Sequence, residues 1–167
     1  MSLANRICQI LHDEHCATIA LMQRLEQLVG RNRKDDPPDA NDPVVAKLLA
    51  DLSTGMTNEL DRHFDFEERE LFSYLSEAGD EGIAAHLMEE HVAIRPLALA
   101  IAKLVREARS QGFKDARWSE FRRLAQEFCE RIGAHIDKEE HVLLPALQET
   151  MSAEAEAKLY EEYAETV

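Results

Sequence analysis

The chain has 167 residues, of which 45% are hydrophobic and 31% are charged, and its formal net charge at pH 7 is −14. This length fits one domain with a substantial core, and the balance of apolar and charged residues is typical of a soluble globular protein. Because phosphates repel an acidic protein, the charge argues against nucleic acid and anionic membranes as partners.

Targeting and redox signals are few. No apolar run approaches the roughly 20 residues of a membrane span, and the start of the sequence has no signal-peptide pattern. The three cysteines, Cys8, Cys16 and Cys129, are odd in number and lack the spacing of a metal finger. We therefore expect reduced thiols in a cytoplasmic protein.

Four long segments of helical periodicity follow one another along the chain. They cover about 3–29, 44–75, 83–109 and 117–149, separated by loops rich in Gly, Pro and Asp. A short Ala- and Glu-rich segment comes next, with Ser152 as its expected N-cap. The sequence predicts an all-α fold: an up-down antiparallel four-helix bundle over residues 1–151, and a short fifth helix in the C-terminal tail, 152–167.

The first and third predicted helices each carry one histidine in an apolar stripe. The stripe within residues 7–29 contains His15, and the stripe within residues 83–105 contains His91. The two stripes align with a constant offset of 76 residues (15 to 91), and a glutamate precedes each histidine. Both histidines therefore belong to a face that is expected to point into the core.

The second and fourth predicted helices contain a longer polar interruption. Both carry the pattern H-x-x-x-E-E-x-x-L, which begins at His63 and again at His135, 72 residues later (63 to 135). Residues four apart lie on one helix face, so Glu67 shares the core-facing stripe with His63, and Glu139 shares it with His135. The sequence thus contains an internal repeat, in which each copy is one helical hairpin.

Six polar side chains are expected to point into one core. They are His15, His63, Glu67, His91, His135 and Glu139. Two buried carboxylates without partners would be very costly, and two metal ions would remove that cost. Imidazole and carboxylate ligands suit iron, manganese or zinc. If both carboxylates bridge, each metal has four protein ligands, and a bridging oxide or hydroxide leaves a position open for a small ligand.

Simpler interpretations apply to the same residues taken singly. One histidine in a core stripe is usually only hydrogen-bonded to a neighbour, and each H-x-x-x-E pair could be a buried ion pair. The repetition of all six residues at equivalent positions favours metal binding over a structural network.

Several polar residues lie beside the predicted ligands. His12 is one turn before His15 and could be an outer partner or a substitute ligand, but its counterpart in the third helix is Met88 (12 + 76). Glu68 and Glu140 point away from the stripe, either as solvated charge or as hydrogen-bond partners of the ligand imidazoles. The remaining histidines, His86 and His141, are expected at the surface.

The ordered motifs resemble the hemerythrin-like family, the HHE cation-binding domain, from Glu14-His15 through His135-Ile-Asp-Lys-Glu139 to the following Leu-Leu-Pro-Ala-Leu147. The resemblance implies a bundle that holds a non-haem di-iron centre, with the four histidines as terminal ligands and the two glutamates as bridges.

The sequence departs from the oxygen-carrying hemerythrins at two points. Those proteins have a fifth histidine where this chain has Leu87, and a histidine and an aspartate five apart in the fourth helix in place of H-x-x-x-E. The departures bring the chain closer to bacterial HHE proteins associated with iron handling, nitric oxide or oxidative stress. The cysteine-containing N-terminal region of the iron–sulfur repair members is not present, which argues against that role.

We expect a binding protein more than an enzyme: a di-iron site that binds or senses oxygen, nitric oxide or iron itself, with a small diatomic ligand as its partner. Manganese or zinc could substitute for the two iron ions. One alternative is a di-iron enzyme acting on peroxide or nitric oxide in a stress response, although no acid–base pair or electron-donor docking motif is evident. Another is a structural or regulatory domain whose fold depends on metal.

Overall fold

The computed structural model describes residues 5–79 and 81–166, and the regular elements within these ranges are all helical. They are α1 (Arg6–Arg31), α2 (Pro43–Thr54), η1 (Gly55–Glu59), α3 (Leu60–Phe66), η2 (Glu67–Leu71), α4 (Phe72–Ala78), α5 (Glu81–Gln111), α6 (Asp115–Lys138), η3 (Glu139–Leu143), α7 (Leu144–Thr150) and α8 (Ala153–Ala164), where η marks a π-helical turn. The all-α prediction is confirmed. None of the described helices is long and apolar enough to cross a membrane.

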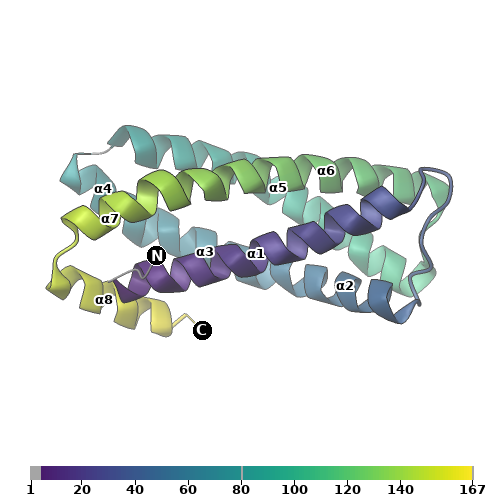
Figure 1. Ribbon diagram of the computed structural model, residues 1–167, viewed down its shortest axis with the longest axis horizontal. Coiled ribbons are helices and arrows are strands. Elements are labelled where there is room, and N and C mark those ends of the chain that lie inside the picture. The colour runs from purple at the N-terminus through teal and green to yellow at the C-terminus, as the bar shows by residue number, and fades with distance from the viewer. Residues whose placement is uncertain (1–4, 80, 167) are drawn as a thin grey trace.

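The elements form a helical bundle of four long segments (Figure 1). α2 to α4 are continuous through two π turns, and α6 continues through η3 into α7. Successive long segments run in opposite directions in the view of Figure 1. α1 contacts α2 and α6, and α5 contacts the same two helices, so each long segment has two neighbours. The short α8 turns back along the bundle and contacts α1.

Side-chain N-caps precede α1, α2 and α8. Asn5 accepts hydrogen bonds from the backbone N–H groups at the start of α1, and Asp42 does so before Pro43 in α2. Ser152 caps α8, as predicted, by accepting from the N–H of Ala155 at 3.2 Å.

The second, third and fourth long segments extend a few residues beyond the predicted ranges, whereas the first helix begins later than predicted, at Arg6, and ends two residues later. α1 continues past Gly30 to Arg31, and Gly82 lies inside α5, because one glycine within a helix costs only about 1 kcal/mol. A left-handed Gly79, with φ of 101°, ends the second long segment instead.

The π turns were not predicted, and two of them are equivalent in the repeat. η2 begins at Glu67 and η3 at Glu139. The N–H of Phe72 donates to the carbonyl of Glu67 five residues back, and the N–H of Leu144 donates likewise to that of Glu139. A π turn holds one more residue than an α turn and is frequent at functional sites. Each predicted bridging glutamate therefore opens a locally widened turn.

The hydrophobic core is divided into two clusters. One contains Leu25, Leu52 and Phe121, and the other contains Leu11 and Leu147 near the opposite end of the bundle. Between the clusters lies a layer of buried polar side chains.

Candidate metal centre

The polar layer consists of the six residues that the repeat predicted to face the core. They are His15, His63, Glu67, His91, His135 and Glu139, each at most 7% exposed. Their ligand atoms form two groups of four, one with His15 and His63 and one with His91 and His135, and each group includes both glutamates. Within each group the ligand atoms lie within 4.8 Å of one another. The structure thus brings all six together, with both carboxylates shared.

The imidazole Nε2 atoms meet in pairs at the centre of the layer. The Nε2 atoms of His15 and His63 are 3.2 Å apart, and those of His91 and His135 are 3.0 Å apart. Ligand bonds of about 2.1 Å place neighbouring donor atoms roughly 3.0–3.4 Å apart around one ion. The nitrogen pairs therefore have the spacing of ligands to a common metal.

The carboxylates lie at similar distances from these nitrogens. Glu67 Oε1 is 3.2 Å from His63 Nε2, and Glu139 Oε1 is 3.0 Å from His135 Nε2. The second oxygen of Glu139 is 3.1 Å from His15 Nε2, and that of Glu67 is 3.5 Å from His91 Nε2. Each carboxylate therefore presents one oxygen to each histidine pair, as a bridging ligand requires.

These carboxylates lack hydrogen-bond donors as long as the nearby imidazoles are neutral and carry their proton on Nδ1. Among the described residues, no donor reaches either oxygen of Glu67 or of Glu139 with hydrogen-bond geometry, although imidazole nitrogens are close. Both side chains are fully buried. A buried carboxylate without a donor or a cation carries a large desolvation penalty. Two bound cations would balance both charges, so the residues present fit a dimetal group.

A ring of outer carboxylates holds the four imidazoles. Each Nδ1–H donates to a glutamate on a neighbouring helix: His63 to Glu14 (2.7 Å), His91 to Glu68 (2.8 Å), His135 to Glu90 (2.9 Å) and His15 to Glu140 (2.6 Å). A neutral histidine that donates from Nδ1 has its lone pair on Nε2, which here points to the centre. The ring therefore sets all four imidazoles in the tautomer that a metal ligand needs.

The sequence identified only half of this ring. Glu68 and Glu140 take the second of their two predicted roles, that of hydrogen-bond partners. Glu14 and Glu90 were noted only as neighbours of the core histidines, yet each bonds a histidine of the next helix. The signal for them was their equivalence at an offset of 76 (14 to 90).

Every outer carboxylate also has a further polar neighbour, and these neighbours differ between the two halves. Arg62 and the hydroxyl of Tyr163 donate to Glu14, Arg95 donates to Glu68 at 3.1 Å, Lys138 donates to Glu90 at 2.5 Å, and His12 lies 2.8 Å from Glu140. None of these side chains is repeated at the equivalent position. The six ligand candidates are therefore repeated in the two halves, whereas the side chains that contact the outer glutamates are not.

The three histidines outside the repeat lie away from the centre. The ring of His12 reaches Glu140 and is the outer partner that the sequence allowed. His86, which is 3.4 Å from Glu90, and His141, which bonds the carbonyl of Asp137, are exposed as expected.

Protonation of the centre reflects a balance of burial and charge. Burial lowers the pKa of His135, but the close Glu139 carboxylate outweighs it and raises that pKa to about 9. At His63, burial is likewise outweighed, chiefly by Glu67, and the pKa lies well above its usual range. Burial dominates at His91 and lowers its pKa. Without a metal, protons on His63 and His135 thus balance the carboxylates, and a metal has to displace them.

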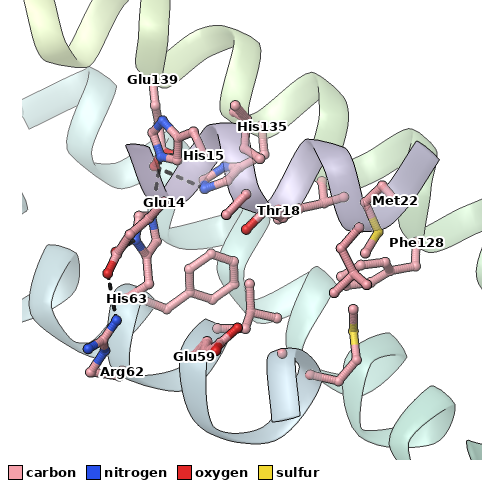
Figure 2. Close-up of a pocket in the computed structure, with 18 residues that line it drawn as sticks. Glu14, His15, Thr18, Met22, Glu59, Arg62, His63, Phe128, His135 and Glu139 are labelled. Atoms are coloured by element: carbon pink, nitrogen blue, oxygen red, sulfur yellow. Dashed lines mark hydrogen bonds and ion pairs between the residues drawn. The ribbon is translucent and has the colours of Figure 1, made fainter. Parts of the chain in front are cut away.

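The surroundings of the two histidine pairs differ. The ring of Phe64 stacks on His91, with centroids 3.6 Å apart and planes within 9°. Leu87, at the position of the fifth histidine of oxygen carriers, is 2% exposed and packs in the apolar cluster. On the other side, a cavity reaches His15 and His63 (Figure 2).

Comparison with known proteins agrees with this arrangement. A family model described as the hemerythrin HHE cation binding domain matches residues 6–147, a range that includes all six core ligand candidates. Comparison with curated proteins gives no match. The chain belongs to the hemerythrin HHE cation-binding domain family.

Proposed function

We propose that the protein holds two non-haem iron ions and binds or senses a small ligand, oxygen or nitric oxide, at an open position of the bimetallic site. The observation that carries the proposal is the sharing of two donor-free carboxylates between two histidine pairs. We place this function in the cytoplasm because the thiols of Cys8, Cys16 and Cys129 are free.

The residues divide into three roles in this proposal. His15 and His63 would hold one iron, His91 and His135 the other, and the two glutamates would bridge them. Iron, when bound, supplies an open coordination position and a change of oxidation state. The outer glutamates keep the Nε2 lone pairs directed inwards, and the apolar clusters on either side limit the access of water.

Metal analysis combined with spectroscopy tests the proposal. Protein loaded anaerobically with iron(II) is expected to contain two irons per chain, and addition of oxygen or nitric oxide is expected to produce a visible charge-transfer band. Protein that retains two irons but responds to neither gas would contradict ligand binding. Manganese and zinc suit the same donor atoms, so loading with each measures the preference for iron.

The enzyme alternative is favoured by one observation, the cavity that reaches the site. An enzyme acting on peroxide or nitric oxide would turn over many times, whereas a binding protein would react once per site. A purely structural metal would instead show a lower melting temperature after chelation and no reaction with either gas.

A further inference from the structure

One cavity of the protein ends at the candidate metal centre. It has a volume of about 220 Å³ and lies between α1, the η1–α3 segment and α6 (Figure 2). Its inner end is formed by His15, His63, His135 and Glu139, so it meets both histidines of the first pair but only one histidine, His135, of the second. Its other walls are largely apolar and include Met22, Met56, Leu60, Phe128 and Ile132.

At the equivalent place in the second half of the repeat, the described residues form a groove, between α5 and α6, that does not reach the candidate ligands. Thr18 and Gly55 line the cavity, whereas Ile94 and Glu127 line the groove at the equivalent positions (18 + 76 and 55 + 72). A methyl group on Gly55 would lie 3.0 Å from Leu21 Cδ2, so this glycine permits the close approach of η1 to α1. The smaller side chains thus let the cavity reach the ligand candidates in one half, whereas the groove of the other half stays outside them.

The aromatic contacts are asymmetric in the same sense. Phe64 covers His91 by stacking on its ring. The residue equivalent to Phe64 is Ile136 (64 + 72), which lines the cavity. Phe64, which also lines the cavity, therefore stacks on an imidazole of one half, whereas its aliphatic counterpart in the other half has no ring to stack.

We propose that this cavity is a ligand chamber that delivers a neutral, mostly apolar molecule of up to about benzene size to the metal held by His15 and His63. The proposal rests on the dimetal function above and adds a second ligand class, besides oxygen and nitric oxide, and the side of entry. An apolar cavity of about 150 Å³ binds benzene. The volume here is larger, so the chamber exceeds what oxygen or nitric oxide needs.

Two features define the polarity of the ligand. Among the described lining residues, Thr18 alone carries a hydroxyl group, and it lies one helical turn after His15 on the same face (Figure 2). Its hydroxyl can donate a hydrogen bond to an oxygen atom of the ligand beside the metal. Glu59 is exposed and lines the chamber. Its carboxylate disfavours an anion, whereas Glu14 and Arg62, which also line the chamber, pair with each other. We therefore assign to the chamber a neutral ligand with one hydroxyl-type oxygen.

Titration with 4-fluorophenol, followed by fluorine NMR, tests the chamber on zinc-loaded and on metal-free protein. Saturable binding is expected in both forms, because the apolar walls do not require the metal. Thr18→Ile, which copies Ile94, is expected to weaken binding at least tenfold by filling space. Thr18→Val keeps the shape and removes the hydroxyl, so a loss of roughly fivefold is expected.

Matched variants and an anionic probe complete the test. Ala17 and Ala93 are equivalent exposed alanines (17 + 76); Ala17 lines the chamber, and Ala93 lines the groove between α5 and α6. Ala17→Trp is expected to slow association of 4-fluorophenol at least fivefold, and Ala93→Trp to leave it unchanged. 4-Fluorobenzoate is expected to bind at least tenfold more weakly, and equal binding would overturn the assignment of a neutral ligand.

Metal content measured on the same samples separates the two proposals. Wild-type protein that holds two zinc ions but does not bind 4-fluorophenol, or Thr18→Ile protein with unchanged affinity, would overturn the chamber alone. Saturable binding by protein that takes up no metal would support the chamber as an apolar ligand site and overturn the dimetal function.

Discussion

At the residue scale, each core histidine has a separate task for each ring nitrogen. Nδ1 donates to a carboxylate of a neighbouring helix, and Nε2 faces the centre. The outer hydrogen bond fixes the ring orientation and makes Nε2 a better electron donor. The outer glutamates should therefore influence metal affinity although none of them belongs to the two ligand groups.

Replacement of Glu140 by glutamine tests this influence. Glu140 accepts from the Nδ1 of both His15 and His12, and Glu140→Gln removes its negative charge while keeping its shape. We expect a 10- to 100-fold loss of metal affinity, measured by competition with a chelator. Glu149→Gln, on an exposed position of α7, is the control and should leave the affinity unchanged. Equal affinities of the two variants would contradict a role for the outer ring.

At the element scale, the predictions from the sequence succeeded where periodicity carried the information. The stripes located the four long segments and placed both H-x-x-x-E pairs on the core face, because the histidine precedes the π turn and the spacing up to the glutamate is that of an ordinary helix. The π turns themselves were missed. A π turn depends on what the opened turn packs against, such as the burial of both Leu71 and Phe72 just after Glu67, and periodicity does not contain that information.

The side chains that contact the outer glutamates also could not be predicted from the sequence. Arg62, Arg95 and Lys138 lie on three different elements, and only the assembled bundle shows which glutamate each one reaches. Tyr163 is the most distant example: it follows Glu14 by 149 residues and still donates to it. Contacts of this range follow from helix packing and have no local signal.

α8 provides a test of this contact between elements. The hydroxyl of Tyr163 donates to Glu14, which holds His63, while its ring packs edge-on against Phe66. Tyr163→Phe keeps the ring packing and removes the hydrogen bond to a charged group, so we expect a loss of about 1.5–3 kcal/mol in the free energy of unfolding. Urea unfolding measures it.

Tyr160 on the same helix supplies the matched control. Its ring lies under the guanidinium of Arg6, a contact that phenylalanine retains. Tyr160→Phe is therefore expected to change the free energy of unfolding by less than about 0.5 kcal/mol. A similar loss in both variants would show that α8 is held by general packing and not by the contact with Glu14.

At the scale of the whole molecule, the buried polar layer divides the core and makes stability depend on what neutralises it. A metal that binds only the folded state stabilises that state by mass action, by about 2.7 kcal/mol at a free concentration 100 times the Kd. We expect a higher melting temperature with iron(II) under anaerobic conditions, and its reversal by a chelator, measured by circular dichroism. Identical melting curves with and without metal would contradict binding at the layer.

The stability of the metal-free protein should also depend on pH. The pKa of His135 rises from 6.5 to about 9 on folding, so its contribution is complete below pH 6.5 and is lost as the pH rises through 9. The pKa of Glu139 is lowered from 4.5, because the close His135 and His15 outweigh its burial, so its contribution is present above pH 4.5 and is lost in acid. Maximal stability is therefore expected between these limits.

Urea unfolding across this range measures the effect. His135 alone accounts for a decline on the order of 3 kcal/mol between about pH 6 and pH 9.5. His91, whose pKa is lowered by burial, acts in the opposite direction and reduces the net decline.

A bound metal needs deprotonated imidazoles, so its affinity should rise over the same interval and the metal-loaded protein should lose less stability. A metal-free protein whose stability rises from pH 6 to pH 9.5 would show that the histidines are neutral in the folded state, and that desolvation, not carboxylate pairing, dominates the layer.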